Sequence, residues 1–367
     1  MRVIIVGTRG FPNVQGGLEK HCECLSVNLV TLGCDVTVFT RKPYVDVSLK
    51  NFQGVKLVAL PAFRHKLFEN FFHTLLCIFV SLKYKKDIIH FQAIGSALLV
   101  PLARLFGMKV VLTSHGSNYQ HLKWGRFAKL VLKLSEFLGV TFTNKVIAIS
   151  RTIADEIKEK YNRDAAVIPN GVYIPRVTGD KNILNKYGLQ EKKYILAVGR
   201  FVPEKGFHDL IEAFNRVSLN DLKLVIVGDA DHKDAYSMRL KEIGLKNKDI
   251  IMPGFLRGEV LQGLYSHAVL FVLPSYYEGF PIALLEALGS GLSCLASDIP
   301  GNRNIDLAGE RFFTPGDSGM LSELLKEFSQ KPLGEEVKKE QINTLAAKFD
   351  WENIARQTIV VYSKAVS

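Results

Sequence analysis

The chain has few of the residues that mark metalloproteins and disulfide-bonded secreted proteins. It has five cysteines, and only Cys22 and Cys24 stand close together in sequence. A structural metal site normally takes four well-spaced ligands, so we expect no metal. Cysteines that are odd in number and dispersed along the chain are typical of a reducing cytosol.

Long hydrophobic runs are also missing. The best candidate for a membrane span, Leu67 to Leu82, is shorter than the ~20 residues that a span needs and contains Glu69, Asn70 and His73. The first residues lead directly into an apolar run, Arg2 to Gly7, which is typical of a buried strand rather than of a signal peptide. We therefore expect neither a transmembrane helix nor a signal peptide.

Negative charge is scarce in the first half. Residues 1–180 hold 24 Lys and Arg against 12 Asp and Glu, a net charge of +12, whereas residues 181–367 carry −1. Part of this excess lies in the segment 121–134, where apolar residues share one helix face and cations mark out the other side: Trp124, Phe127, Val131 and Leu134 against Lys123, Arg126, Lys129 and Lys133. Such a helix suits an anionic membrane surface. A core-packed helix with a solvated face is the alternative, and no nucleic-acid-binding motif is present.

At 367 residues the chain suits two domains, and the first opens as a βαβ unit. A glycine-rich loop follows the first strand, and a helix that ends near Gly33 leads to a second strand from Asp35 to Thr40. The spacing is not the G-x-G-x-x-G of dinucleotide-binding proteins, so we do not expect NAD. Gly16 and Gly17 at the helix start let backbone N–H groups approach a phosphate or a sugar. A plain glycine-rich turn is the alternative.

His115 is a candidate for binding a substrate. The run from Val110 to Asn118 predicts a strand that leads into a loop, and ligands of doubly wound sheets bind at the carboxyl ends of strands. A single histidine is more often structural, and that alternative stays open.

The second half begins again with a strand, Tyr194 to Arg200. Arg200 and Lys205 follow it, and a guanidinium fork with an ammonium charge suits a diphosphate. Two solvated surface cations are the alternative. The D-x-D triplet Asp229-Ala230-Asp231 resembles a metal-binding motif, but these two cations can supply its countercharge, so we interpret it as a loop without metal.

The stretch from Pro274 to Leu288 combines two carboxylates with a helix start. It predicts a loop that carries Glu278 and a helix that carries Glu286, with Pro281 at the first helical position. A helix N-terminus suits a phosphate, and carboxylates accept hydrogen bonds from sugar hydroxyls. This is what a nucleotide-sugar pocket needs; two carboxylates around a capped helix are the alternative.

These patterns predict an N-terminal Rossmann-like domain over 1–172, a linker over 173–180 and a C-terminal Rossmann-like domain over 181–348. We expect the last segment, 349–367, to form a helix that packs back on the first domain. The residues that trace one face of this helix are Trp351, Ile354, Thr358, Ile359 and Tyr362.

Four motifs, in this order, resemble those of family 4 glycosyltransferases. They are Val6–Gly10 with Gly16–Glu19, Val198–Gly206, Glu278–Glu286 with its E-x7-E spacing, and Ala296–Asp298. The resemblance implies the α/β GT-B fold, in which two doubly wound domains face each other across a cleft. It also implies retention of anomeric configuration. The opening and Lys123–Gly125 resemble a bacterial subgroup that builds capsule, exopolysaccharide and O-antigen.

The resemblance implies a role for each site residue. Arg200 and Lys205 would bind the donor diphosphate, Glu278 the sugar hydroxyls and Glu286 the ribose. The backbone that would hold the sugar and phosphate runs through Gly279, Phe280, Pro281 and Ile282.

Three residues of the first domain have implied roles. Gly16 and Gly17 would lie over the donor phosphate, near the acceptor. His115 would contact the donor sugar near its anomeric centre and, with Arg200, Lys205 and Glu278, would form the catalytic group.

We therefore expect a metal-independent, cytoplasmic glycosyltransferase that associates peripherally with the inner face of the cell membrane. It would move a hexose or N-acetylhexosamine from a nucleoside diphosphate sugar to a polyprenyl-diphosphate-linked or other lipid-linked glycan. UDP is favoured because it is the commonest carrier in the family, and no nucleic-acid partner is expected. A sugar-nucleotide epimerase of the same architecture and a non-catalytic glycolipid- or nucleotide-binding scaffold are the alternatives.

Overall fold

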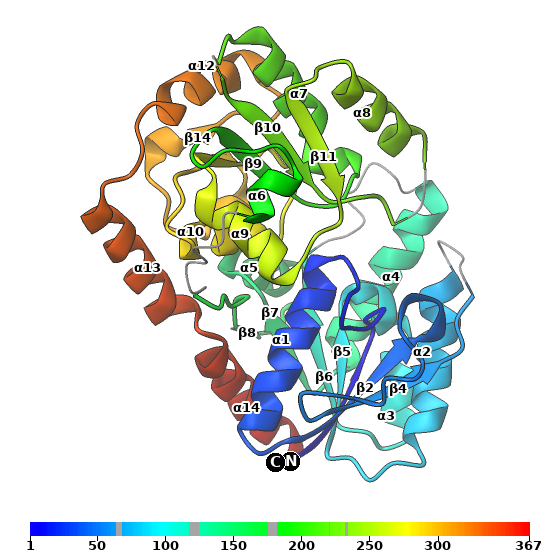
Figure 1. The fold of residues 1–367 in the computed structure, drawn as a ribbon. Helices are drawn as coiled ribbons and strands as arrows, with labels where there is room; N and C mark the ends of the chain where they lie inside the picture. The colour runs from blue at the N-terminus through cyan, green and yellow to red at the C-terminus, as the bar shows by residue number, and fades with distance from the viewer. Residues whose placement is uncertain (64–67, 117–124, 175–181, 220, 232–233) are drawn as a thin grey trace. The chain divides into compact units, whose positions relative to one another are not determined.

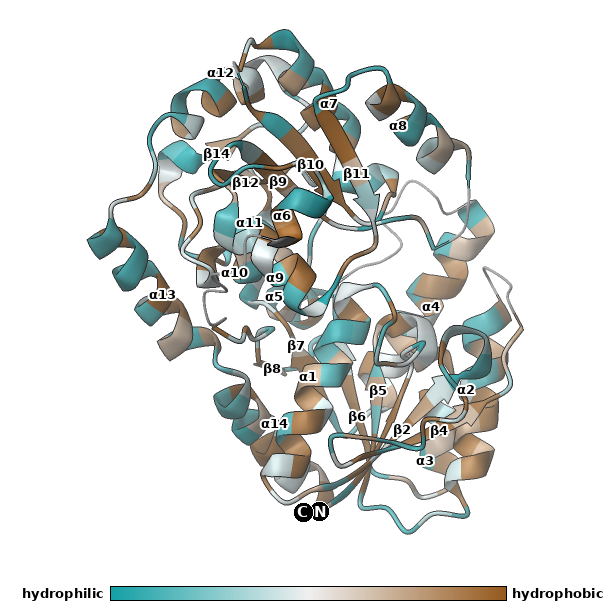
Figure 2. Cartoon of the chain, viewed as in Figure 1, coloured by the Kyte–Doolittle hydropathy of each residue, from teal (hydrophilic) through white to brown (hydrophobic). Residues whose placement is uncertain are grey.

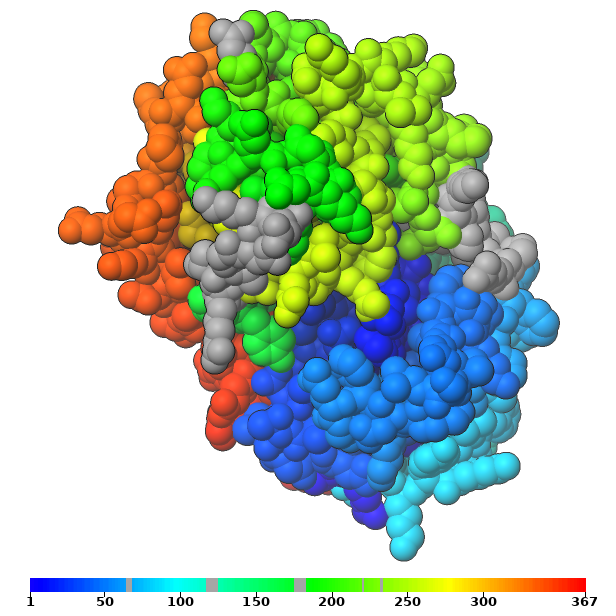
Figure 3. All heavy atoms as spheres, in the orientation of Figure 1, coloured from blue at the N-terminus to red at the C-terminus, as the bar shows by residue number. Residues whose placement is uncertain are grey.

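The structure is a computed structural model that describes residues 1–63, 68–116, 125–174, 182–219, 221–231 and 234–367 (Figure 1). The chain divides into two compact units, Met1–Gly171 with Trp351–Ser367, and Val172–Asp350. Side chains fill the space between the ribbons of each unit (Figure 3). Most of the predicted linker, 175–180, and the start of the predicted basic helix, 121–124, lie outside the described residues.

The first unit is built on an eight-stranded sheet in the order β3-β4-β2-β1-β5-β6-β7-β8. Its strands are β1 (Arg2–Val6), β2 (Asp35–Arg41), β3 (Asn51–Phe52), β4 (Val55–Leu60), β5 (Ile88–Gln92), β6 (Val110–Ser114), β7 (Lys145–Ala148) and β8 (Ala165–Val167). All neighbours are parallel except β3, which runs antiparallel to β4. Parallel strands are covered on both faces, which is why β5 and β6 are buried along their whole length.

Helices cover both faces of this sheet. α1 (Gly17–Thr31) and α14 (Trp351–Val366) pack on each other on one side, and α2, α3 and α4 lie on the other (Figure 1). The last helix of the chain therefore contributes Trp351, Ile354 and Tyr362 to the core of the first unit. The other helices here are η1 (Lys42–Tyr44), α2 (Phe68–Ser81), η2 (Ile94–Leu99), α3 (Val100–Leu105), α4 (Arg126–Phe142) and α5 (Arg151–Tyr161).

The second unit is built on a six-stranded parallel sheet in the order β11-β10-β9-β12-β13-β14. Its strands are β9 (Tyr194–Val198), β10 (Lys223–Val227), β11 (Ile250–Gly254), β12 (Leu270–Leu273), β13 (Cys294–Ser297) and β14 (Phe312–Phe313). Both units are thus Rossmann-like α/β domains, as the sequence predicts. In each the strand order reverses beside the first strand, between β1 and β5 and between β9 and β12.

Helices also surround the second sheet, and α7 and α12 pack on its central strands to form the core. The helices of this unit are α6 (Asn182–Lys186), η4 (Pro203–Lys205), α7 (Phe207–Arg216), α8 (Ala235–Leu245), α9 (Gly258–His267), α10 (Ile282–Gly289), α11 (Pro300–Arg303), η5 (Gly309–Arg311), α12 (Ser318–Ser329) and α13 (Glu335–Phe349).

One predicted helix start is wrong by one residue. Pro281 was expected at the first helical position, but its backbone is extended (φ −78°, ψ 109°) and α10 begins at Ile282. The fixed φ of proline suits the residue before a helix as well as its first turn, so the sequence pattern does not separate the two positions.

The predicted amphipathic helix is α4, but its apolar face is not packed into the core. Phe127 is 68% exposed and Leu134 is 48% exposed. α4 instead packs through small residues: a Cβ on Gly139 would lie 2.4 Å from the Ala97 Cβ of η2. The core-packed alternative is therefore wrong for these two side chains. Figure 2 shows that hydrophobic residues make up much of α3 and alternate with polar ones along α4. Within the described ranges, no helix combines the length and the apolarity needed to cross a bilayer.

Candidate active site

Loops that leave the carboxyl ends of β9 and β12 bring three predicted residues of the second unit to one edge of its sheet. Arg200 and Lys205 follow β9, and Glu278 follows β12. These two strands flank the point at which the strand order reverses, which is where open α/β sheets bind ligands.

Lys205 and Glu278 form a close ion pair across this point. Lys205 Nζ donates to Glu278 Oε1 at 2.5 Å, and Ser275 Oγ donates to the same oxygen at 2.7 Å. The side chains are only 19% and 11% exposed, so water screens the pair poorly. An anion that reaches Lys205 therefore meets a charge already positioned by a carboxylate.

Close backbone contacts hold the loops that carry the pair. A Cβ on Gly206, which has φ +63°, would lie 2.1 Å from the Pro274 carbonyl oxygen. A Cβ on Gly301 would lie 2.1 Å from the Glu278 carbonyl oxygen. Only glycine permits these approaches, and they fix the loop after β9 and the loop after β13 against the loop that bears Glu278.

Arg200 and the D-x-D triplet form a second group of charges at this edge. Arg200 Nη1 donates to Asp231 Oδ2 at 3.0 Å, and Lys241 Nζ lies 2.7 Å from Asp229 Oδ1. Each aspartate thus has a cation beside it. Arg200 supplies countercharge as the sequence predicts, but Lys205 does not, because it pairs with Glu278; Lys241 takes its place.

The second predicted carboxylate, Glu286, lies in α10. It accepts a hydrogen bond from Tyr265 Oη at 3.2 Å. Burial, followed by the charge of Glu286, raises the pKa of the Tyr265 phenol well above its usual value, so Tyr265 stays a donor. Among the described residues, no side chain caps the α10 N-terminus after Pro281, so its first backbone N–H groups can meet a ligand.

In the first unit, the loop after β1 holds Gly16 and Gly17 at the start of α1. Arg9 Nε donates to Glu19 Oε1 at 2.9 Å and Arg9 Nη2 donates to the Gln15 carbonyl at 2.5 Å. This pair leaves no room for a side chain at Gly16, since a Cβ there would lie 2.1 Å from Glu19 Oε2. Gly17 differs: no described atom lies within 4 Å of where its Cβ would be.

His115 follows β6 and is partly exposed. Its Nε2 lies 2.9 Å from Gln92 Oε1, and its ring packs edge-on against His21 of α1 at a centroid distance of 4.8 Å. Burial, followed by the charges of His21 and His90, holds the pKa of His115 well below its usual value. The ring is therefore neutral near pH 7.

Two family descriptions match consecutive parts of this chain. Residues 15–176 match "Glycosyltransferase Family 4", and residues 180–346 match "Glycosyl transferases group 1". The chain belongs to glycosyltransferase family 4. The expected GT-B fold is thereby confirmed, because solved structures of this fold match over nearly the whole chain.

The relatives of this glycosyltransferase include enzymes with different named activities. It is 25% identical to an uncharacterised glycosyltransferase of Methanocaldococcus jannaschii over 100% of this chain and 99% of the relative. It is 32% identical, over 60% of each chain, to the Escherichia coli UDP-Gal:alpha-D-GlcNAc-diphosphoundecaprenol alpha-1,3-galactosyltransferase. Sucrose-phosphate synthase from Thermosynechococcus elongatus superposes with a TM-score of 0.84 at 22% identity, covering 99% and 98% of the two chains.

The glycosyltransferase contains site neighbours that the sequence reading did not single out. Ser275 and Tyr265 hold the two carboxylates, Arg9 shapes the Gly16 loop, and Gln92 holds His115. Gln92, Arg9 and Ser275 had a usable signal, since each ends or follows a strand at the carboxyl edge of a sheet. Tyr265 had none, because it reaches Glu286 from α9, a helix outside the motifs.

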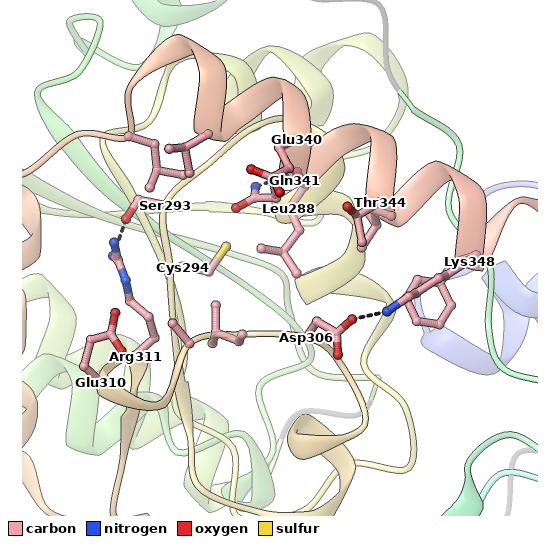
Figure 4. Close-up of a pocket in the computed structure, with 16 residues that line it drawn as sticks. Leu288, Ser293, Cys294, Asp306, Glu310, Arg311, Glu340, Gln341, Thr344 and Lys348 are labelled. Carbon is pink, nitrogen blue, oxygen red and sulfur yellow. Dashed lines mark hydrogen bonds and ion pairs between the residues drawn. The ribbon is translucent and has the colours of Figure 1, made fainter.

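A separate pocket in the glycosyltransferase has a volume of about 490 Å³. It lies between α13 and the segment 306–311, with Cys294 at its centre and the Asp306–Lys348 and Arg311–Ser293 contacts on its walls (Figure 4). Cys294 begins β13, so the pocket opens at the edge of the sheet opposite Glu278. Of the described residues that line it, none is predicted to bind the donor.

Proposed function

We propose that this glycosyltransferase moves a hexose or N-acetylhexosamine from a nucleoside diphosphate sugar, UDP favoured, to a lipid-linked glycan in surface polysaccharide synthesis. The observation that carries the proposal is the Lys205–Glu278 pair at the strand reversal of the second unit. It places an ammonium for a phosphate beside a carboxylate for sugar hydroxyls, which is the composition of a nucleotide-sugar donor.

Each site residue has one role in this proposal. Lys205 and Arg200 bind the donor diphosphate, Glu278 accepts hydrogen bonds from the sugar, and Glu286 from the ribose. The α10 N-terminus offers N–H groups to the phosphate, and the backbone from Gly279 to Ile282 follows the sugar.

The transfer retains anomeric configuration through attack on the face that the diphosphate leaves. The bond from the anomeric carbon to the phosphate oxygen breaks, the acceptor oxygen bonds to that carbon, and the leaving phosphate takes the acceptor proton. Charge develops on the diphosphate, and Arg200 with Lys205 stabilises it. Asp229 and Asp231 are already paired with Lys241 and Arg200, so we assign no metal to this triplet. The positive charge beside the diphosphate then comes from Arg200 and Lys205.

The names of relatives support the choice of donor and acceptor. The E. coli relative takes UDP-Gal and a diphosphoundecaprenol-linked sugar, and a further relative, from Salmonella typhimurium, is an O-antigen chain mannosyltransferase that is 29% identical over 62% of this chain. The first name gives a lipid-linked acceptor and the second an O-antigen chain, so together they favour a lipid-linked glycan in surface polysaccharide synthesis.

We also infer that the first unit binds an anionic membrane surface. Large apolar side chains are exposed on three neighbouring helices: Phe72 and Phe79 on α2, Leu105 on α3, and Phe127, Leu130, Leu134 and Phe137 on α4. Exposed cations stand among them, at Lys83, Lys109 and Arg126. Burial of the apolar side chains in the lipid–water interface favours peripheral binding, and so does the attraction of the cations to lipid phosphates.

Sedimentation with vesicles of phosphatidylglycerol and phosphatidylcholine tests the membrane inference. We expect the protein to pellet with vesicles at low salt and to be released in part at high salt. A protein that stays in the supernatant at low salt would refute the inference.

A nucleotide panel tests the donor site. Thermal unfolding is measured with UDP, GDP, dTDP, ADP and CMP for the wild type, Lys205→Ala and the control Lys348→Ala, whose lysine pairs with Asp306 at the opposite edge of the sheet. A ligand at 100 times its Kd stabilises by about 2.7 kcal/mol. We expect one diphosphate, UDP, to stabilise the wild type and the control but not Lys205→Ala.

Turnover separates the transferase from the two other functions. Incubated with the preferred donor and a polyprenyl-diphosphate-linked acceptor, Lys205→Ala should transfer about 10²–10³ times more slowly than the wild type. Isomerisation of the donor without acceptor would indicate an epimerase, and nucleotide binding without turnover on any acceptor would indicate a scaffold. Near-normal transfer by the folded variant would remove Lys205 from the mechanism.

A further inference from the structure

A chain of hydrogen bonds runs through the core of the first unit from the last helix to His115. Tyr362 Oη of α14 lies 2.7 Å from His90 Nδ1, and Thr113 Oγ1 lies 2.7 Å from His90 Nε2. The amide of Gln92 joins this chain to His115: its Nε2 packs against the His90 ring, 3.4 and 3.3 Å from the two ring nitrogens, and its Oε1 lies 2.9 Å from His115 Nε2.

The residues of this hydrogen-bond chain that lead to His115 are buried away from water. Tyr362, His90 and Gln92 are each 0% exposed, and Thr113 is 1% exposed. Buried polar groups destabilise a core unless they are paired, and a satisfied network fixes each side chain in one orientation. The network lies at the carboxyl ends of β5 and β6, beside the strand reversal of the first unit, where ligands of such sheets bind.

The orientation of the Gln92 amide in this hydrogen-bond chain also determines which nitrogen of His115 carries the proton. With its amide nitrogen facing His90, Gln92 turns its oxygen to His115, and an oxygen accepts. His115 Nε2 must then be protonated, so that Nδ1 of the neutral ring carries the lone pair. Nδ1 has no hydrogen-bond partner among the described residues, and His115 is partly exposed, so Nδ1 is the nitrogen that can accept from a ligand hydroxyl.

We propose that Gln92 is a positioning residue that fixes the Nε2–H tautomer of His115, and that Tyr362 supports it through His90. His115 Nδ1 thereby presents an acceptor to a hydroxyl of the donor sugar. The sugar contact rests on the proposed transferase function, whereas the tautomer and its dependence on Gln92 do not.

The tautomer is measured directly. Nitrogen-15 spectra of histidine-labelled protein distinguish a protonated from an unprotonated ring nitrogen. We expect His115 to be Nε2–H in the wild type, and a mixture of both tautomers in Gln92→Leu. Gln92→Glu keeps an oxygen beside Nε2 and should keep the Nε2–H form. A wild-type His115 protonated on Nδ1, or an unchanged tautomer in folded Gln92→Leu, would overturn the proposal.

Kinetics then tests the effect on the reaction. We expect Gln92→Leu to lower kcat about 10²-fold, and Tyr362→Phe on the order of 10-fold, because the acceptor nitrogen is misplaced. The Kd for UDP alone should change less than about twofold, since the residues proposed to hold the nucleotide lie in the second unit. Gln92→Glu should recover part of the kcat that Gln92→Leu loses.

Tyr194→Phe is the matched control for Tyr362→Phe. Tyr194 is also fully buried and its hydroxyl is also hydrogen-bonded, here as the donor to the Leu264 carbonyl at 2.6 Å, but it lies in the second unit. Equal losses of kcat in the two variants would show a general loss of stability and overturn the role of Tyr362. If the wild type transfers no sugar, the proposed function fails, while the nitrogen spectra still decide the tautomer.

Discussion

Gly16 and Gly17 are neighbours in sequence but have different surroundings, and this difference yields a prediction. Gly16 has φ +147° and no room for a Cβ beside Glu19, so Gly16→Ala must strain the backbone or break the Arg9–Glu19 pair. We expect it to lower stability by about 1–3 kcal/mol. Gly17→Ala meets open space and should leave the thermal midpoint within about 1 °C of the wild type.

Activity distinguishes the two glycines further. If donor phosphates occupy the space beyond Gly17, Gly17→Ala should raise the donor KM roughly 10-fold or more while the protein stays folded. Calorimetry and donor kinetics on the two variants check both effects. Equal stability of the two variants would contradict the geometry of the loop, and a normal KM for Gly17→Ala would remove Gly17 from the donor site.

Single residues show where sequence reasoning stops. A cation after one strand and a carboxylate after another predict a charged site, and the parallel sheet brings Lys205 and Glu278 together although they are 73 residues apart. The sequence does not indicate that they pair with each other, because loop contacts such as that of Gly301 with the Glu278 backbone set the distance. The expectation that Lys205 would neutralise the D-x-D triplet failed for this reason.

At the scale of elements, the starts of strands were the easiest features to predict. β2, β6 and β9 begin at the predicted Asp35, Val110 and Tyr194. Buried parallel strands are continuous apolar runs between polar loops, so their ends are sharp in sequence. The three-residue strand β8 was missed, since it lies at the sheet edge and is too short and too exposed to give such a run.

The faces of α2, α3 and α4 allow a prediction about the membrane. Leu105 of α3 is 83% exposed, so Leu105→Asp should not disturb folding. It would remove an apolar side chain from the lipid interface and add charge of the wrong sign, which should weaken binding to anionic vesicles roughly 10-fold or more.

Leu245→Asp is the matched control, because Leu245 is 86% exposed on α8 of the second unit. Sedimentation across a series of lipid concentrations gives both affinities. If the two variants bind vesicles equally well, α3 does not enter the lipid interface, and the membrane-binding face does not include this helix.

For the whole molecule, the most distant contacts were the least predictable. The His90–Tyr362 hydrogen bond joins residues 272 apart, and it depends on where α14 lies on the sheet. The apolar face of the last helix was visible in sequence, but the polar partner of Tyr362 was not, because a tyrosine on such a face reads as core.

The same burial makes the first unit sensitive to acid. Burial lowers the pKa of His21 to about 4 and of His90 to about 3, and burial with the charge of Arg41 lowers the pKa of His73 to about 4. Unfolded histidines have a pKa of about 6.5, so below that pH the unfolded chain takes up protons that the native unit refuses. Stability from these groups is complete above pH 6.5 and is lost as the pH falls toward 4.

His73 tests this most cleanly, because it lies apart from the hydrogen-bond chain of His90. Each such histidine should lower the free energy of unfolding by about 1 kcal/mol between pH 6.5 and 5.5, because the unfolded imidazole is already half protonated at pH 6.5. Urea unfolding is followed in a Trp124→Phe background, where the buried Trp351 reports on the first unit. The loss over this interval should be smaller in His73→Gln by about that amount, whatever the substitution does to stability at pH 7. Parallel pH curves for the two proteins would mean that His73 takes up its proton in the native state, and that its burial does not set the acid limit of the unit.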